Sequence, residues 1–340
     1  MHCELVIPGL FAAAPSVQTA PRVPALELLL ARGRCASDAS QRLETWLRDA
    51  FDLGDKPLPA GALTLLGTGE DPGNDCWSRA DPVDLRLLRD RVILVPGAAL
   101  HIKEEEARDL CQALNGHFGS RIEVRVVSAE RWVARFADEV HIDADSPLEL
   151  AGRDVELACP AAAGASFSHR ILNEAQMVLH AHPVNQAREA RGEPAVNSVW
   201  LWGAGRAPKE EMRIEPARWQ SVSADDPVAL GLARAAGIRH RPLGGSAAEW
   251  LERMPEEGRH LIVLDGLRAP LALGATGEYR DAVAAIEKDW ALPLLDALRA
   301  RRIGMLSIHV PDAAECVAYE TIRGDLRRFW RRPKPLESYA

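Results

Sequence analysis

The chain lacks the features that anchor a protein in a membrane or staple it with disulfide bonds. No apolar run among its 340 residues approaches the roughly 20 residues that a membrane-spanning helix needs. Its first residues do not combine a basic region with a long apolar core, as a secretory leader would. The six cysteines lie far apart and form no C-x-x-C pair, which indicates neither a zinc site nor a disulfide framework. We therefore expect a cytoplasmic protein with no membrane partner.

An excess of positive charge is also missing. The formal net charge is −8, and acidic and basic residues are mixed throughout. A protein that follows a nucleic-acid backbone presents a basic stripe instead. The exception is the segment from Arg323 to Lys334, where arginines surround Phe329 and Trp330, and a solvated terminal helix accounts for it. We expect no nucleic-acid partner.

The strand-like runs differ between the ends and the middle of the chain. His260 to Leu264 is continuously apolar, as buried parallel strands are, whereas 122–126 and 132–136 alternate, as half-buried antiparallel strands do. Apolar residues at helical spacing predict helices over 25–32, 41–51 and 104–118. These patterns predict an α/β core with a mostly parallel sheet, built from 1–75 and 192–340. Residues 76–191 would form an inserted α+β lobe.

The most informative stretch runs from His180 to Pro208. His182, Asn185 and Arg188 offer an imidazole, an amide and a permanently charged guanidinium that could grip a carboxylate or a phosphate. Ser198 to Trp202 follows as an apolar strand, and a strand that ends in a glycine loop is a common ligand site in α/β sheets. The alternative is that the cluster ends one helix and caps the next.

This stretch resembles the corresponding part of the archaeal-type cofactor-independent phosphoglycerate mutases, which belong to the alkaline phosphatase superfamily. The pattern is H-P-V-N-x-x-R-x-x-x-G-x-P-A-x-N, then a strand and G-x-G-x-x-P. It matches at His182, Pro183, Asn185, Arg188, Gly192, Pro194, Ala195, Asn197, Gly203, Gly205 and Pro208. A closer resemblance, to the bacterial RpfE-type regulatory proteins, is carried by Cys76 to Val83 and by Trp200-Leu-Trp202. The resemblance implies an alkaline-phosphatase-like core with an inserted cap.

The resemblance also implies two bound metal ions and a nucleophilic serine, and here the chain departs from it. Side chains that cannot serve stand at four essential positions, namely Pro8, Leu58, Ala269 and Ile308. Asp265 and His309 remain as residual metal-ligand candidates, and Thr64 is the hydroxyl nearest to the serine position. A two-metal phosphoryl-transfer site needs more ligands than these.

Arg79 matches an arginine that enters the cleft beneath the cap of the mutases. The alternative is a salt bridge to Asp81 or Asp84. With His182, Asn185 and Arg188, it completes our candidate set for binding an anion.

The sequence thus predicts a phosphoglycerate-mutase-like protein without a nucleophile or most metal ligands. We expect a non-catalytic regulatory or ligand-binding protein that needs no cofactor and recognises a small anionic metabolite or a protein. The alternative is an active mutase or phosphatase with a rearranged site that uses Mn or Zn.

Overall fold

The chain folds into two compact units in a computed structural model. The structure describes residues 1–11, 21–39, 42–88, 91–142, 144–154, 165–208, 218–254, 257–311 and 315–339. Unit 1 comprises Met1–Gly54 and Met212–Ala340, and unit 2 comprises Asp55–Glu211.

Unit 1 is built on a seven-stranded sheet, here called sheet A, with the strand order β2-β12-β11-β1-β10-β8-β9. Neighbouring strands from β11 to β9 are parallel, while β12 is antiparallel to both of its neighbours. The strands are β1 (His2–Val6), β2 (Arg34–Ala39), β8 (Ser221–Ala224), β9 (Arg239–Arg241), β10 (Arg259–Val263), β11 (Met305–Val310) and β12 (Glu315–Ile322). The expected mostly parallel sheet is therefore present.

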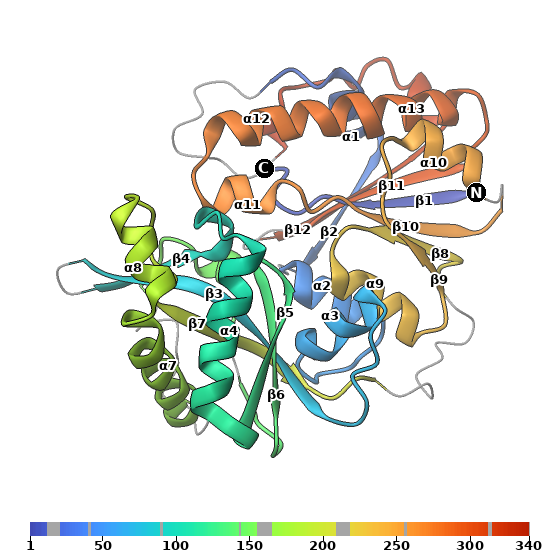
Figure 1. Cartoon of the computed structure of the whole chain (residues 1–340). Coiled ribbons are helices and arrows are strands. Elements are labelled where there is room, and N and C mark those ends of the chain that lie inside the picture. The colour runs from blue at the N-terminus through green and yellow to red at the C-terminus, as the bar shows by residue number, and fades with distance from the viewer. Residues whose placement is uncertain are drawn as a thin grey trace. The chain divides into compact units, whose positions relative to one another are not determined.

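Helices cover sheet A on both faces (Figure 1). One face packs against α1 (Pro24–Arg32), α10 (Ala247–Arg253), α12 (Thr276–Ala285) and α13 (Leu292–Arg299), with the π-helical segment Ile286–Ala291 between the last two. The other face carries α2 (Leu43–Ala50) and α9 (Pro227–Ala235). The short α11 (Arg268–Ala272) follows β10. The helices expected over 25–32 and 41–51 are thus confirmed within two residues.

Unit 2 is built on an antiparallel sheet, here called sheet B. Its strands are β3 (Cys76–Leu88), β4 (Arg91–Pro96), β5 (Ile122–Ser128), β6 (Arg131–Phe136) and β7 (Ser198–Gly205). Its helices are α3 (Ala60–Thr68), α4 (Glu104–Phe118), α5 (Pro147–Leu150), α7 (Ala165–His180) and α8 (Pro183–Ala190). Apolar side chains of α4 and α7 form one core with sheet B, and those of α3 form a second core with Trp77 and Val133.

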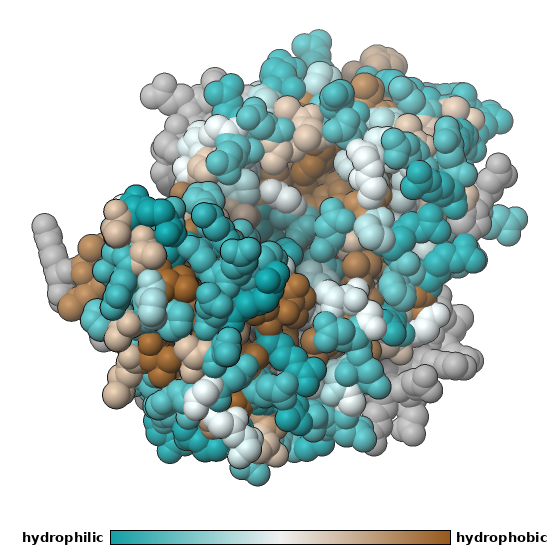
Figure 2. Space-filling model, in the orientation of Figure 1, coloured by the Kyte–Doolittle hydropathy of each residue, from teal (hydrophilic) through white to brown (hydrophobic). Residues whose placement is uncertain are grey.

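Helix α4 has the bounds that its apolar spacing predicts. Its buried side chains, Ala107, Leu110, Cys111, Leu114 and Phe118, recur on one side of the helix and face the sheet. Its other side is charged, and the surface over α4 is accordingly hydrophilic (Figure 2).

The boundary between the units differs from the one expected at residues 75 and 192. Both α3 and β7, which we had assigned to the core, belong to unit 2. The physical reason is strand pairing, since β7 lies antiparallel to β3 from Val83 to Trp77 and α3 packs on both strands.

The apolar run 62–67 lies in the helix α3, and a small residue, Gly61, lets the first turn of this helix approach β3. One local expectation needs correction. The basic C-terminal segment is not a helix; the structure shows only the short 3-10 turns Asp325–Arg327 and Leu336–Ser338. Pro333 and Pro335 disfavour a longer helix there.

Candidate functional site

The three polar residues of the His182 cluster lie at the start and on the inner side of α8. His182 is the N-cap of this helix, and its Nδ1 accepts a hydrogen bond of 3.2 Å from the backbone N–H of Val184. Pro183 at the first helical position suits its fixed φ and missing N–H. His182 therefore begins the helix, as the capping alternative expects.

The side-chain amide of Asn185 forms three hydrogen bonds with backbone groups of unit 2. Its Oδ1 accepts from the N–H of Val196 at 2.8 Å, and its Nδ2 donates to the carbonyl of the same residue at 2.9 Å. Nδ2 also donates to the carbonyl of Leu179 at 2.8 Å, near the end of α7. The side chain is buried. It holds α7, α8 and the segment before β7 together.

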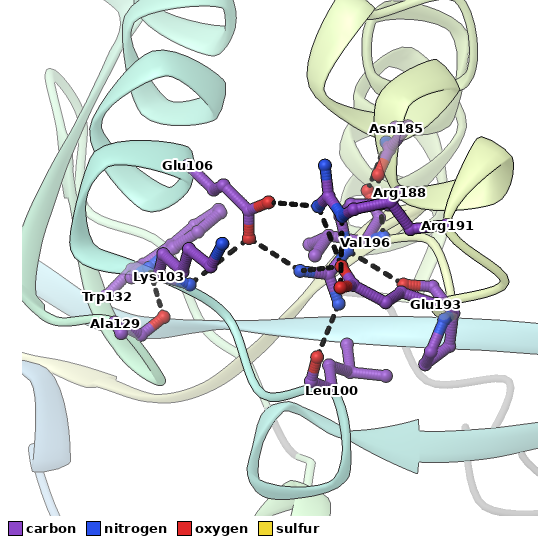
Figure 3. A network of polar contacts seen from close by, with 11 residues as sticks. Leu100, Lys103, Glu106, Ala129, Trp132, Asn185, Arg188, Arg191, Glu193 and Val196 are labelled. Atoms are coloured by element: carbon purple, nitrogen blue, oxygen red, sulfur yellow. Dashed lines mark hydrogen bonds and ion pairs between the residues drawn. The ribbon is translucent and has the colours of Figure 1, made fainter.

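Arg188 is fully buried, and each of its nitrogens donates to an acceptor of its own unit. Nη1 contacts the Glu106 carboxylate at 2.6 Å, Nε donates to the carbonyl of Pro194 at 2.9 Å, and Nη2 donates to the carbonyl of Leu100. These contacts lie between α8 and the start of α4 (Figure 3). The side chain has the arrangement of a structural cross-link.

Glu106 is the centre of this network, and the sequence analysis missed it. Its Oε2 accepts from Arg188 and from the N–H of Lys103, the residue before α4, while Oε1 accepts from Arg191 at 2.8 Å. Burial would raise the pKa of Glu106, but the Lys103 N–H and the Arg188 guanidinium lower it below its usual value. Glu106 is the third residue of α4, a position from which glutamate commonly caps its own helix, so that half of its role was detectable in the sequence.

Arg79 lies on β3 and has a separate set of partners. Its Nε and Nη2 bind Asp81 Oδ1 at 3.1 and 2.6 Å, and its Nη1 donates to the Thr64 hydroxyl at 3.3 Å. The second Asp81 oxygen accepts from Trp202 Nε1 at 2.7 Å. The salt bridge with Asp81 that we had considered is therefore formed, and it is buried. Arg79 and Arg188 thus bind different groups of unit 2.

The start of helix α3 packs against the glycine loop that follows Trp202. Gly203 has a φ of +58°, and a Cβ atom there would lie 2.5 Å from the Cβ of Ala60. A Cβ on Gly205 would lie 2.9 Å from the Cβ of Pro59. These glycines are needed because another segment of unit 2 lies against them.

The residual metal-ligand candidates lie in unit 1, at the carboxyl ends of adjacent parallel strands. Val6 at the end of β1 is in register with Val263 of β10 and with His309 of β11. Pro8 and Asp265 follow two residues after Val6 and Val263, so both lie at the edge of sheet A near His309. This is the edge where open α/β sheets bind ligands.

Side chains of α11 and α12 pack against the loop that follows β1. Tyr279 of α12 donates its hydroxyl to the carbonyls of Gly9 and Leu10 at 2.8 and 3.2 Å. Leu271 of α11 lies so near that a Cβ on Gly9 would be 3.1 Å from it. Pro8 itself is buried. No motif in the sequence predicted this role of Tyr279.

His309 lies within a group of charges on sheet A. Its Nε2 is 3.8 Å from Glu4 Oε2, and its ring lies 5.3 Å from that of Trp46. Arg259 Nε donates to Glu4 Oε1 at 2.7 Å, and Arg218 lies 3.8 Å from Oε2. Burial would raise the pKa of Glu4, but Arg259 and Arg218 hold it below its usual value. Glu4 therefore remains an anion paired with cations of unit 1.

The donor set at this edge does not fit a pair of metal ions. Across the part of the chain that the structure describes, no three histidine, cysteine, aspartate or glutamate side chains are grouped closely enough to hold an ion. Two hydrolytic metals need about 4 Å separation and several shared ligands.

Comparisons with known proteins agree with the resemblance of the sequence. The family model described as 2,3-bisphosphoglycerate-independent phosphoglycerate mutase matches residues 75–185. The chain is therefore similar to these mutases over part of its length. A probable mutase of Geobacter sulfurreducens is 28% identical over 160 residues, which cover 46% of this chain and 39% of that one. The mutase of Aeropyrum pernix is 27% identical over 297 residues, covering 74% and 67%.

The likeness to phosphoglycerate mutases has limits in length and in identity. The first three curated relatives are matched over only 29–51% of their own length. The PH0037 protein of Pyrococcus horikoshii shares the fold, with a TM-score of 0.57 at 15% identity over 94% of this chain and 87% of that one.

Among the described helices, none is both long and apolar enough to cross a membrane.

Proposed function

We propose that this phosphoglycerate-mutase-like protein does not carry out metal-dependent phosphoryl transfer and acts as a non-catalytic regulatory or binding protein. We also propose that unit 1 is an alkaline-phosphatase-like core and that the chain is of the RpfE type. The proposal goes beyond kinship with the mutases, because relatives at this identity can differ in their chemistry.

The closed loop after β1 carries the proposal. The resemblance aligns Pro8 with a metal-binding aspartate, and proline has no side-chain donor. Tyr279 and Leu271 occupy the surroundings of this loop. The Tyr279 hydroxyl is already bound to two backbone carbonyls, and the Leu271 side chain is aliphatic. These surroundings favour a packed interior over an open ion site.

The surroundings of Thr64 support the same conclusion. Thr64 is fully buried within α3, and its hydroxyl already accepts from Arg79. A nucleophile must reach the phosphorus atom and must be activated by a base or a metal. Leu58, at the aligned serine position, offers no oxygen at all. The nucleophilic step therefore has no group to perform it among the described residues of this segment.

The anion-binding role of His182, Asn185, Arg188 and Arg79 stays a prediction and is not part of this proposal. Asn185, Arg188 and Arg79 are buried, and their polar atoms bind groups of unit 2. A ligand at these residues would have to displace those groups.

Metal content and turnover together test the proposal. The protein would be dialysed against manganese and zinc salts, freed of unbound ions and measured by plasma mass spectrometry. Phosphoglycerate mutase turnover would be followed in parallel. We expect less than stoichiometric metal and background turnover, both unchanged in the variant Asp265→Asn/His309→Gln.

The competing function is an active mutase or phosphatase with a rearranged site. The observation that favours it is that Asp265 and His309 lie at one edge of sheet A. Two bound ions per chain, with both binding and turnover lost in the double variant, would establish this function and refute ours.

A further inference from the structure

The C-terminal part of unit 1 exposes two large aromatic side chains on one turn. Phe329 and Trp330 are 78% and 66% exposed, and their rings lie edge to face with centroids 5.3 Å apart. Five arginines, one lysine and one aspartate lie between residues 322 and 334, a local charge of +5 in a chain of −8. We call residues 322–334 the aromatic-arginine turn.

Arginine side chains of this turn bind backbone groups elsewhere in unit 1. Arg328 donates to the carbonyl of Arg32 at 3.2 Å and pairs with Asp325 at 2.8 Å, while Arg331 donates to the carbonyl of Gly33 at 2.7 Å. Asp325 is buried and also accepts from the N–H of Ile322. The one carboxylate of the turn is thus used internally, and two arginines connect the turn to the end of α1.

Four further cations of the turn are exposed: Arg323, Arg327, Arg332 and Lys334. Exposed apolar patches with a polar rim mark sites of interaction with proteins or membranes. The surrounding charge selects a negatively charged partner. Aromatic rings with flanking arginine and lysine are the combination that inserts at the boundary between lipid headgroups and acyl chains.

We propose that the aromatic-arginine turn is a docking site for an anionic membrane surface. The rings of Phe329 and Trp330 enter the interface, and the exposed cations contact lipid phosphate and carboxylate groups. The contact is peripheral, because the turn is far too short and too charged to span a bilayer. This departs from our sequence expectation that the protein has no membrane partner.

The geometry favours a lipid surface over single-stranded nucleic acid. Nucleic-acid platforms present flat ring faces to successive bases along a basic groove. Here the two rings are at 82° to each other, so one presents its edge beside the face of the other. A compact turn with two protruding rings can insert into the interfacial region of a lipid bilayer.

Vesicle sedimentation of the full chain tests the proposal. The probes are vesicles of phosphatidylcholine alone and vesicles that contain one third phosphatidylserine. We expect several-fold more bound protein on the anionic vesicles at low salt, and a loss of most binding at high salt because surface charges are screened. Brominated lipids should quench part of the tryptophan fluorescence, and Trp330→Phe should remove that quenching.

Matched variants separate the turn from general stickiness. Phe329→Ala/Trp330→Ala and Arg327→Glu/Arg332→Glu should each reduce binding at least tenfold. Met177→Ala and Arg253→Glu, at exposed positions elsewhere, should leave it unchanged. Because these side chains are exposed, the variants should fold, which circular dichroism would verify.

Three results would overturn the proposal. They are equal binding to neutral and anionic vesicles, no binding at low salt, or unchanged binding by both turn variants. Binding to an oligothymidylate that Phe329→Ala/Trp330→Ala abolishes, without vesicle binding, would assign the turn to nucleic acid instead.

Discussion

The His182–Gly205 stretch of unit 2 and the strand ends of unit 1 carry the resemblance to phosphoglycerate mutases in opposite ways. In unit 2 the matching side chains are present, and Asn185 and Arg188 bind backbone groups and a carboxylate of their own unit. In unit 1 the positions that the resemblance aligns with metal ligands carry Pro8, Ala269 and Ile308. The first region has the residues of the pattern, and we propose that the second lacks them.

The difference teaches that the residues of a recognisable motif can serve to pack the fold. Asn197, another residue of the pattern, binds the N–H and the carbonyl of Leu85 with one amide, at 2.8 and 3.0 Å. Asn185 does the same with Val196. The family model matches residues 75–185, which lie in unit 2, where such contacts stabilise the fold.

The largest expected effect comes from breaking the unit 2 network with Arg188→Met. The variant leaves Glu106 without its buried cation and two carbonyls without their donor, and it should lower the free energy of unfolding by about 3–5 kcal/mol. Urea unfolding, followed by hydrogen exchange of unit 2 peptides, measures this loss.

Arg170→Met is the matched control for that experiment. Arg170 is exposed on α7 and lies 3.9 Å from Glu174, so its loss should cost less than about 0.5 kcal/mol. If Arg188→Met keeps its stability but no longer binds 3-phosphoglycerate in calorimetric titration, the cluster is an anion site.

A second large effect is expected at the close approach of α3 to β3. A Cβ on Gly61 would lie 2.4 Å from the carbonyl carbon of Ser78, a backbone atom that cannot rotate away. Gly61→Ala should therefore cost about 3 kcal/mol. Gly116→Ala on the open side of α4 has no atom within 4 Å and should be neutral or stabilising by up to about 1 kcal/mol. Thermal unfolding compares the two, and equal effects would contradict the described packing.

The elements of the fold were largely predictable, because the apolar residues that each helix or strand buries recur at a regular spacing in the sequence. The bounds of α4 and the antiparallel pair β5 and β6 follow from spacing alone. The exception, α3, is an apolar helix buried on most sides, so that periodicity cannot separate it from a buried strand.

The partners of the candidate residues could not be predicted from the sequence. Arg188 and Glu106 are 82 residues apart, and nothing local announces their contact. An arginine suited to grip a ligand is equally suited to grip a buried carboxylate. The same holds for Arg79, whose Asp81 partner was one of two alternatives before the structure decided between them.

A smaller effect should follow from Asn185→Asp, which keeps the shape and exchanges a donor for an acceptor. Nδ2 donates to the carbonyls of Leu179 and Val196, and a carboxylate oxygen would repel both. The loss should be about 2 kcal/mol. Urea unfolding checks it, with the exposed neighbour Gln186→Glu as the control. If both variants unfold alike, Asn185 is not the joint that we describe.

The Glu106 network should also make unit 2 sensitive to acid. The folded pKa of Glu106 is lowered, so below the usual glutamate pKa near 4.5 the unfolded chain binds the proton more readily. The free energy of unfolding should therefore fall as pH decreases through the folded pKa, and Glu106→Gln should make that decline shallower. Unfolding measured between pH 6 and about 3 tests the slope. Glu252→Gln, at an exposed position in unit 1, should not change it.

The smallest effect sharpens the unit 1 side of the comparison. Tyr279→Phe keeps the ring in the core and removes the hydroxyl that binds the carbonyls of Gly9 and Leu10. It should cost about 1 kcal/mol and increase hydrogen exchange in the loop after β1. Tyr319→Phe, also a buried tyrosine of unit 1, shows how much any lost hydroxyl costs. If Tyr279→Phe leaves that loop unchanged but alters metal content or turnover, the edge of sheet A is a working site, and the contrast between the two regions disappears.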